Sequence, residues 1–266
     1  MNEREKAIGV CGGVGQAAGN ELCTKYITPN CDNGGSDAGQ ISLYHIARAV
    51  PDRTEFLLGR EKRNPADEMI ATIRAIRAAV DTAEGKEKGL VAGVPCNTFH
   101  APAVWDRFVA LIKNEKLNVE LVHMLRETAA FVKANFPEMK KIGLMSTTGT
   151  RQVGVYRAIF EPLGFEIVEV PEANQSELHD TIYNQQFGIK AINNPVTPQA
   201  RANFEKYVAL LKDGGAEAVI LGCTEIPLAL PEKDLNGTPL IDPMLALARA
   251  LIREANRQKL VPLLGK

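Results

Sequence analysis

The chain has 266 residues, which is enough to bury a substantial core and to form two compact domains. Hydrophobic residues make up 45% and charged residues 24% of it, and 31 Lys and Arg nearly balance 32 Asp and Glu, for a formal charge of -1. This balance gives no general attraction to nucleic acid or to an anionic membrane. No segment approaches the roughly 20 apolar residues of a membrane span, and the charged N-terminus is unlike a signal peptide.

The five cysteines are an odd and sparse set for a chain of this length, so they do not indicate a disulfide framework. We therefore expect a cytoplasmic protein with free thiols. The four histidines are scattered and form no dense set of metal ligands with the cysteines, so no metal site is predicted. They are His45, His100, His123 and His179.

In the first half of the chain, apolar runs at 6–10, 90–94 and 119–122 predict buried strands. A helix is expected to begin after Asn64, which can cap it, with Pro65 at its first position. In the second half, similar runs at 141–145, 218–222 and 239–241 predict strands, and a helix is expected to end at Gly214 and Gly215.

The runs occur in the same order in both halves, and strands that alternate with helices favour parallel sheets. We therefore predict an α/β fold of two similar, pseudo-symmetric domains, each a mainly parallel sheet flanked by helices, with the site in the cleft between them. The predicted limits are 1–117 plus 239–266 for the first domain and 118–238 for the second. Irregular stretches at 28–40 and 184–199 are expected to be lids, interface loops or solvated surface loops.

Cys96 and Cys223 differ in context from the other cysteines, because each follows an apolar strand and precedes a turn that carries hydroxyl groups. In open parallel sheets, ligands sit at the carboxyl ends of strands. A thiol at the N-terminus of a helix is expected to have a lowered pKa. Two such thiols facing one cleft suit a two-base inversion, in which one removes a Cα proton and the other delivers a proton to the opposite face.

The ene-diolate that forms when a Cα proton leaves must be stabilised by fixed hydrogen-bond donors. Polar residues beside the two cysteines and after the strand at 141–145 are candidates for this role. They are Asn97, Thr98, Thr147, Thr148 and Thr224. His100 is expected to be a structural or supporting group.

The chain resembles the aspartate/glutamate racemase family nearly from end to end. The matching motifs, in chain order, are Gly12-Gly13-Val14-Gly15, "AVPDRTEFLLG" ending at 59, "PCNTFHAP" at 95–102, "LVHMLRETA" at 121–129, "IGLMSTTGT" at 142–150, "FGIKAIN" at 187–193, "AVILGCTEIPLAL" at 218–230 and "PLIDPM" at 239–244. Two cysteine motifs in order, with the others between them, make the resemblance specific.

The resemblance implies catalysis without pyridoxal phosphate or metal, two domains around the site, and a homodimer. By motif position, Cys96 and Cys223 correspond to the catalytic pair, and Arg53 and Lys190 to the cations that hold the substrate carboxylates. Asn97, Thr98 and Thr148 correspond to polar substrate contacts, and Gly13 in the first loop is a further expected contact. The resemblance also suggests, as a hypothesis, that Cys223 deprotonates the L-isomer and Cys96 the D-isomer.

Within this family, Gly12-Gly13 in the first loop and Glu225 two residues after the second cysteine indicate the aspartate branch. The chain departs from that branch at Val14-Gly15-Gln16 and at Phe99. Aspartate is therefore the first expected substrate, with glutamate or a broader range of amino acids as alternatives.

Other functions remain open from the sequence. A decarboxylase or a dicarboxylate isomerase would lie within the same superfamily, and a non-catalytic amino-acid-binding protein would need the cations without the thiols. An NAD-binding oxidoreductase is suggested by the G-x-G-x-x-A pattern at 13–18. That fingerprint also needs an acidic residue at the end of the next strand, and Asp32 and Asp37 follow no apolar run.

Overall fold

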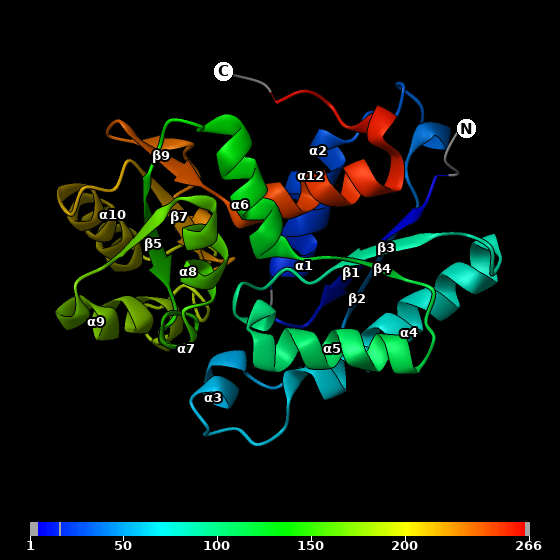
Figure 1. Cartoon of the computed structure of the whole chain (residues 1–266), viewed down its shortest axis with the longest axis horizontal. Coiled ribbons are helices and arrows are strands. Elements are labelled where there is room, and N and C mark those ends of the chain that lie inside the picture. The colour runs from blue at the N-terminus through cyan, green and yellow to red at the C-terminus, as the bar shows by residue number, and fades with distance from the viewer. Residues whose placement is uncertain (1–4, 16, 264–266) are drawn as a thin grey trace.

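The structure is a computed structural model that describes residues 5–15 and 17–263, and Figure 1 shows two lobes, each built on one sheet. The sheet of the first lobe has the order β2-β1-β3-β4, and all of its strands are parallel. These strands are β1 (Ala7–Gly12), β2 (Leu43–Ala47), β3 (Leu90–Gly93) and β4 (Glu120–Val122).

The sheet of the second lobe has the order β6-β5-β7-β9-β8. Its parallel strands are β5 (Lys141–Ser146), β6 (Glu166–Glu169), β7 (Ala218–Gly222) and β9 (Thr238–Ile241), and β8 (Asp234–Leu235) runs antiparallel at the edge. Without β8, the two sheets have the same connectivity. The predicted α/β class and the repeated order of strands are therefore confirmed.

In the first lobe, α4 (Pro65–Glu84) and α5 (Pro102–Asn114) pack together on one face of the sheet. The Asn64 side chain accepts a hydrogen bond from the amide of Ala66, as the predicted cap requires. The other face is covered by α12 (Pro243–Asn256) and by a continuous helical segment that packs against α12. That segment comprises α1 (Ala18–Glu21), a π-helical stretch (Leu22–Ile27) and α2 (Thr28–Asn30).

In the second lobe, α9 (Glu172–Tyr183) and α10 (Pro198–Asp213) cover one face of the sheet. Helices α6 (Met124–Asn135) and α8 (Val155–Phe160) lie between this lobe and α12. The shorter helices are α3 (Arg53–Leu57), α7 (Thr148–Val153) and α11 (Ile226–Ala229). Short 3-10 turns occur at Asp37–Gly39, Thr98–His100, Glu161–Leu163 and Arg257–Lys259.

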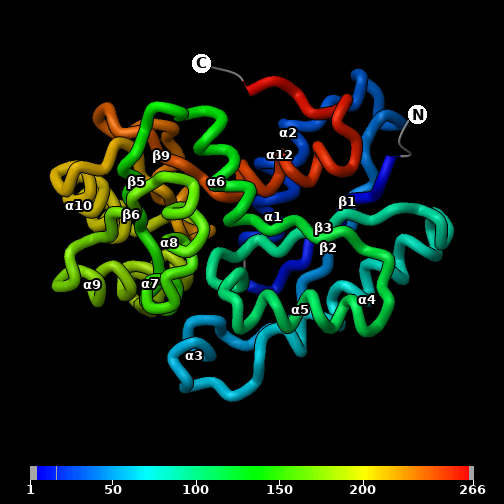
Figure 2. The backbone as a smooth tube through the Cα atoms, in the orientation of Figure 1, coloured from blue at the N-terminus to red at the C-terminus, as the bar shows by residue number. Residues whose placement is uncertain are grey.

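One hydrophobic core is shared by the two lobes, and each lobe has a second core of its own. The shared core contains residues of β1, β5, β7 and β9 together with α6, α8 and α12. The separate cores lie under α4 and α5 in the first lobe and under α9 and α10 in the second. The lobes are thus joined on the side of α6 and α12, as the backbone trace in Figure 2 shows.

The chain passes from one lobe to the other twice, and at both places the strand pairing differs from the predicted domain limits. Strand β4 lies in the second predicted domain but pairs with β3 of the first sheet, and β9 pairs with β7 of the second sheet. The chain therefore crosses after Val122 and returns after Ile241, because each sheet is completed before the chain leaves it. Three strands, β2, β6 and β8, are absent from the sequence prediction.

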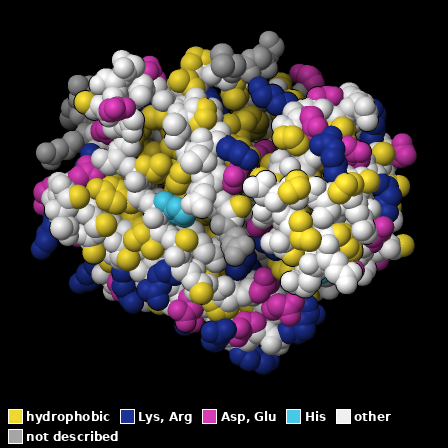
Figure 3. Space-filling model, turned by 180° about the vertical axis from the view of Figure 1, so that it is seen from behind, with side chains coloured by type: hydrophobic (Ala, Val, Ile, Leu, Met, Phe, Trp, Pro, Cys, Tyr) yellow, Lys and Arg dark blue, Asp and Glu magenta, His cyan; other side chains and the backbone are white. Residues whose placement is uncertain are grey.

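No helix in the described part of the chain combines the length and apolar character that crossing a bilayer requires. Around the rim of the face shown in Figure 3, Lys and Arg side chains are interspersed with Asp and Glu side chains. This mixture reflects the near balance of 31 basic and 32 acidic residues.

Candidate functional site

The strand order locates the candidate site. In each sheet, the connections that follow two neighbouring central strands run toward opposite edges of the sheet. These strands are β1 and β3 in the first lobe and β5 and β7 in the second. Ligands of open parallel sheets bind at the carboxyl ends of such strands. There, segments from both lobes enclose a narrow cavity with about 10 Å³ of free space, and its lining consists of Val14, Arg53, Cys96, Asn97, Thr98, Thr147, Tyr183, Lys190, Gly222, Cys223, Thr224 and Glu225.

Cys96 and Cys223 lie 127 positions apart in the numbering yet line the same cavity from different lobes. Each is 6% exposed. Cys96 follows β3 and Cys223 follows β7 directly. The two thiols are therefore buried from bulk solvent and share one small space.

The sequence analysis expects each cysteine to lie at the N-terminus of a helix. In the structure, neither cysteine lies at the start of a long helix. A 3-10 turn at Thr98–His100 separates Cys96 from α5, and the helix after Cys223 has only four residues. The pKa of Cys223 is raised well above its usual value, first by burial and then by the negative charge of Glu225. The prediction that a helix dipole lowers the thiol pKa is therefore wrong for Cys223.

Glu225 is a buried carboxylate that receives three side-chain hydrogen bonds. Its Oε2 accepts from the Cys223 Sγ at 3.0 Å and from the Thr224 hydroxyl at 3.1 Å. Its Oε1 accepts from the Lys190 Nζ at 2.8 Å. Burial opposes ionisation, but the adjacent ammonium group and these donors hold the Glu225 pKa below its usual value. Cys223 is therefore arranged as a protonated thiol that donates to a carboxylate.

Lys190 has its pKa raised, because attraction to Glu225 outweighs the effect of burial on the ammonium group. Its Nζ also lies 5.5 Å from the centre of the Tyr183 ring. Lys190 belongs to the 184–199 loop, so this loop contributes to the cavity.

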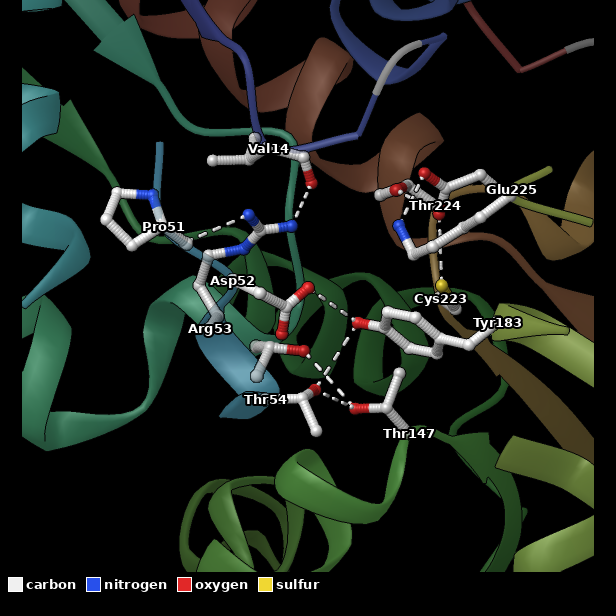
Figure 4. A network of polar contacts seen from close by, with 12 residues as sticks. Val14, Pro51, Asp52, Arg53, Thr54, Thr147, Tyr183, Cys223, Thr224 and Glu225 are labelled. Atoms are coloured by element: carbon white, nitrogen blue, oxygen red, sulfur yellow. Dashed lines mark hydrogen bonds and ion pairs between the residues drawn. The ribbon is translucent and has the colours of Figure 1, made fainter. Parts of the chain in front are cut away.

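Arg53 is the second cation of the cavity and is 7% exposed. Its guanidinium donates to the carbonyls of Val14 at 2.6 Å and Pro51 at 3.2 Å (Figure 4). Burial opposes its charge, but Cys96 and Asp52 raise its pKa further above the usual value. The Nε is buried without a hydrogen-bond partner among the described residues, so it can serve a ligand.

Asn97 offers a second free donor. Tyr156 donates its hydroxyl to the Asn97 Oδ1, which fixes the orientation of the amide. The Asn97 Nδ2 is buried and has no hydrogen-bond partner among the residues described. Since a buried polar atom without a partner is costly, this donor is suited to an anionic ligand in the cavity.

Hydroxyl groups connect the two lobes on one side of the cavity. Thr98 of the first lobe and Thr150 of α7 lie 2.8 Å apart between their Oγ1 atoms, and Thr54 donates to Thr147 at 3.2 Å. Tyr183 extends from the end of α9 to Asp52 and Thr54 (Figure 4).

The structure brings together most of the residues that the sequence predicts for substrate binding, but Thr148 and Gly13 do not line the cavity. The Thr148 amide contacts His179, whereas Thr147, which the sequence also predicts, lines the cavity. Gly13 lines a separate hollow beside His45. Gly13 has a φ of +86°, and a Cβ there would lie 1.6 Å from the Arg48 carbonyl oxygen, so glycine is required by the backbone.

The sequence analysis gives Val14 and Tyr183 no role in the site. It uses Glu225 only to indicate the aspartate branch of the family. Glu225 could have been assigned from its position two residues after Cys223, at the end of the same strand. Tyr183 has no such signal, because it ends an amphipathic helix and its neighbours across the cavity come from distant parts of the chain.

Phe99 and His100 support the loop that carries Cys96. Phe99 is fully buried and packs edge-on against Phe108, with 5.4 Å between ring centres, so this departure from the aspartate branch faces the core. His100 contacts the Cys96 carbonyl through Nδ1 at 2.8 Å and accepts from the Met124 amide through Nε2 at 3.1 Å. The structural role expected for His100 agrees with these contacts.

Residues 12–251 match the family model described as Asp/Glu/Hydantoin racemase. A glutamate racemase of Pseudomonas syringae pv. tomato is 29% identical over 173 residues, which is 63% of this chain and 56% of that protein. The chain thus spans little more than half the length of this curated relative.

Among solved structures, an aspartate racemase of Picrophilus torridus aligns with a TM-score of 0.71 and 24% identity, over 94% of each chain. An aspartate racemase homologue of Pyrococcus horikoshii aligns with a TM-score of 0.62 and 23% identity, over 94% of this chain and 99% of that one. These likenesses support the fold. The family match covers most of the chain, and the protein belongs to the Asp/Glu/Hydantoin racemase family.

Proposed function

We propose that the protein is an amino-acid racemase that inverts the α-carbon of a small acidic amino acid, with aspartate as the first candidate. The observation that carries this proposal is that Cys96 and Cys223, from different lobes, line one cavity. Family membership supports the same class of activity. The proposal includes a cytoplasmic homodimer that works without a cofactor.

In the proposed reaction one cysteine is a thiolate and the other a thiol. The thiolate takes the Cα proton from one face of the substrate, and the thiol gives its proton to the opposite face, so the two cysteines exchange protonation states in each turnover. Because Cys223 donates to Glu225, we assign it as the first proton donor and Cys96 as the first base. In the reverse direction the two roles are exchanged. The resemblance to the family, not the geometry, suggests that Cys223 serves the L-isomer and Cys96 the D-isomer.

The substrate is held through its carboxylates in this proposal. Arg53 offers a guanidinium that can bind a carboxylate with two parallel hydrogen bonds, and Lys190 offers a point charge on the other side. The free Asn97 amide, with Thr98, Thr147 and Thr224, supplies donors for the negative charge that develops on the carboxylate during proton removal.

The cavity is nearly filled by its own lining in this closed form. Its free space of about 10 Å³ is enough for about one water molecule. The lobes must therefore separate to admit the substrate, and Lys190 must share its charge between Glu225 and a carboxylate. The two cations in the lining, Arg53 and Lys190, favour an acidic amino acid over an apolar one.

The proposal is tested by circular dichroism of L- and D-aspartate solutions incubated with wild type, Cys96→Ser and Cys223→Ser. We expect wild type to racemise both isomers and each variant to lose racemisation by roughly 10²–10⁴-fold, the usual contribution of a positioned acid or base. A panel of glutamate and neutral amino acids defines the substrate range. Full racemisation by either serine variant would disprove the two-base assignment.

A further inference from the structure

Tyr183 bridges the two lobes directly beside the candidate site. It is the last residue of α9 in the second lobe, and its ring lines the cavity. The ring stacks on His179 with 4.7 Å between centres. Its hydroxyl lies 3.2 Å from the Asp52 Oδ2 and 3.5 Å from the Thr54 Oγ1, both in the first lobe (Figure 4).

The bridge lies on the side of the cavity opposite the shared core. The lobes are joined through α6, α8 and α12, whereas α3 and α7 meet at the lower edge of the molecule in Figure 1. Two bodies that are joined along one side open most easily on the other. The contacts around α3 are therefore the ones that must break when the cavity opens.

The bridge also acts on the segment that carries Arg53. The Asp52 Oδ1 caps α3 by accepting from the Glu55 amide at 2.9 Å, which leaves its Oδ2 for Tyr183. Arg53 itself is anchored within the first lobe, through the carbonyls of Val14 and Pro51. The Tyr183 hydroxyl thus ties the Arg53 segment to the lobe that carries Lys190.

We propose that Tyr183 is a positioning residue whose hydroxyl fastens α3 to the second lobe when the cavity closes. By doing so it sets the separation between Arg53 and Lys190, and hence the dicarboxylate that the closed cavity accepts. This inference rests on the proposed function for the identity of the substrate, but the bridge itself exists without substrate.

The first test is hydrogen–deuterium exchange of the ligand-free protein, which works whatever the substrate is. Tyr183→Phe keeps the ring and removes only the hydroxyl. Tyr44→Phe is the matched control, because its hydroxyl also donates to a carboxylate, that of Glu84, but within the first lobe. We expect faster exchange over residues 53–60 in Tyr183→Phe and wild-type exchange there in Tyr44→Phe.

The second test is the kinetics of the amino acid that wild type racemises. For Tyr183→Phe we expect a KM raised roughly ten-fold, as for the loss of one hydrogen bond to a charged group, with kcat close to that of wild type. Asp52→Ser keeps a helix-capping side chain but is too short to reach Tyr183. The double variant should be no worse than the more impaired single variant, because both remove the same bridge.

Unchanged exchange over 53–60 in Tyr183→Phe, an unchanged KM, or additive effects in the double variant would each overturn the proposal. Failure of wild type to racemise any amino acid would instead count against the proposed function. In that case the exchange experiment still decides whether Tyr183 holds α3.

Discussion

Glu225 is the residue that sets the charge of the cavity on the side of the second lobe. It pairs with Lys190 and accepts the proton of Cys223 in a hydrogen bond. The ion pair lowers the Glu225 pKa, and the carboxylate in turn contributes to the raised pKa of Cys223. Changing either partner is therefore expected to alter both the charge of the site and its stability.

Glu225→Gln removes this charge and leaves Lys190 without an anion. We expect a loss of roughly 3 kcal/mol of stability, as when one partner of a buried pair is deleted, together with a large loss of racemisation. Lys190→Met combined with Glu225→Gln should recover most of the stability but not the activity. Urea unfolding and racemisation assays of the single and double variants check this, and a double variant as unstable as Glu225→Gln would contradict it.

For single residues, the sequence predicts a place in the site where the neighbours in the chain define the residue's environment. Cys96 and Cys223 each follow an apolar run that can only be a buried strand, so their position at a sheet edge is predictable. Tyr183 is different, because its contacts depend on how distant segments of the chain meet. Of the two predicted neighbours Thr147 and Thr148, only Thr147 lines the cavity, because the direction of a side chain at the start of α7 depends on the exact helix start.

Among the elements, α12 lies in the shared core and contacts strands of both sheets. Asp242 at the end of β9 caps α12 by accepting from the Met244 amide at 2.8 Å. Tyr26 of the π-helical stretch donates its hydroxyl to the same carboxyl group. Burial raises the pKa of Asp242 from 3.8 to about 6, more than these hydrogen bonds lower it.

This shift predicts a pH-dependent stability. Because folding raises the Asp242 pKa, its contribution to stability is complete below about pH 3.8 and is lost as the pH rises through 6. Asp242→Asn retains a capping side chain and carries no charge. Relative to wild type, we expect it to be more stable by about 1–2 kcal/mol at pH 8, a value reduced for partial solvent exposure.

The expected difference shrinks toward pH 5, where Asp242 is largely protonated in the folded state. Urea unfolding of both proteins at pH 5 and pH 8 measures it. An equal difference at the two pH values would show that the charge of Asp242 is not its source.

Elements were predictable where their signals are local. The helix cap at Asn64 and the two similar apolar strands β1 and β5 follow from short sequence patterns. The edge strands β2 and β6 are half-buried or exposed along most of their length, so they lack a continuous apolar run. The assignment of β4 and β9 to sheets depends on pairing with distant strands, which no local pattern specifies.

For the whole molecule, the two sheets of equal connectivity and the shared core create one cavity at the meeting point of their strand ends. The repeated order of strands allowed the two-lobed fold to be predicted from the sequence. The closed form of the cavity was not predictable, because it depends on contacts between lobes such as those of Thr98 and Tyr183. The central claim is that this arrangement presents one thiol to each face of a substrate carbon.

The most direct test of this claim measures exchange of the Cα proton in deuterated water. Proton NMR monitors the exchange for each enantiomer of aspartate separately. With wild type, both isomers should incorporate deuterium during racemisation. With Cys96→Ser, only the L-isomer should retain exchange, through Cys223, and with Cys223→Ser only the D-isomer. Exchange of both isomers by a single-cysteine variant would contradict the account, because one thiol would then reach both faces of the α-carbon.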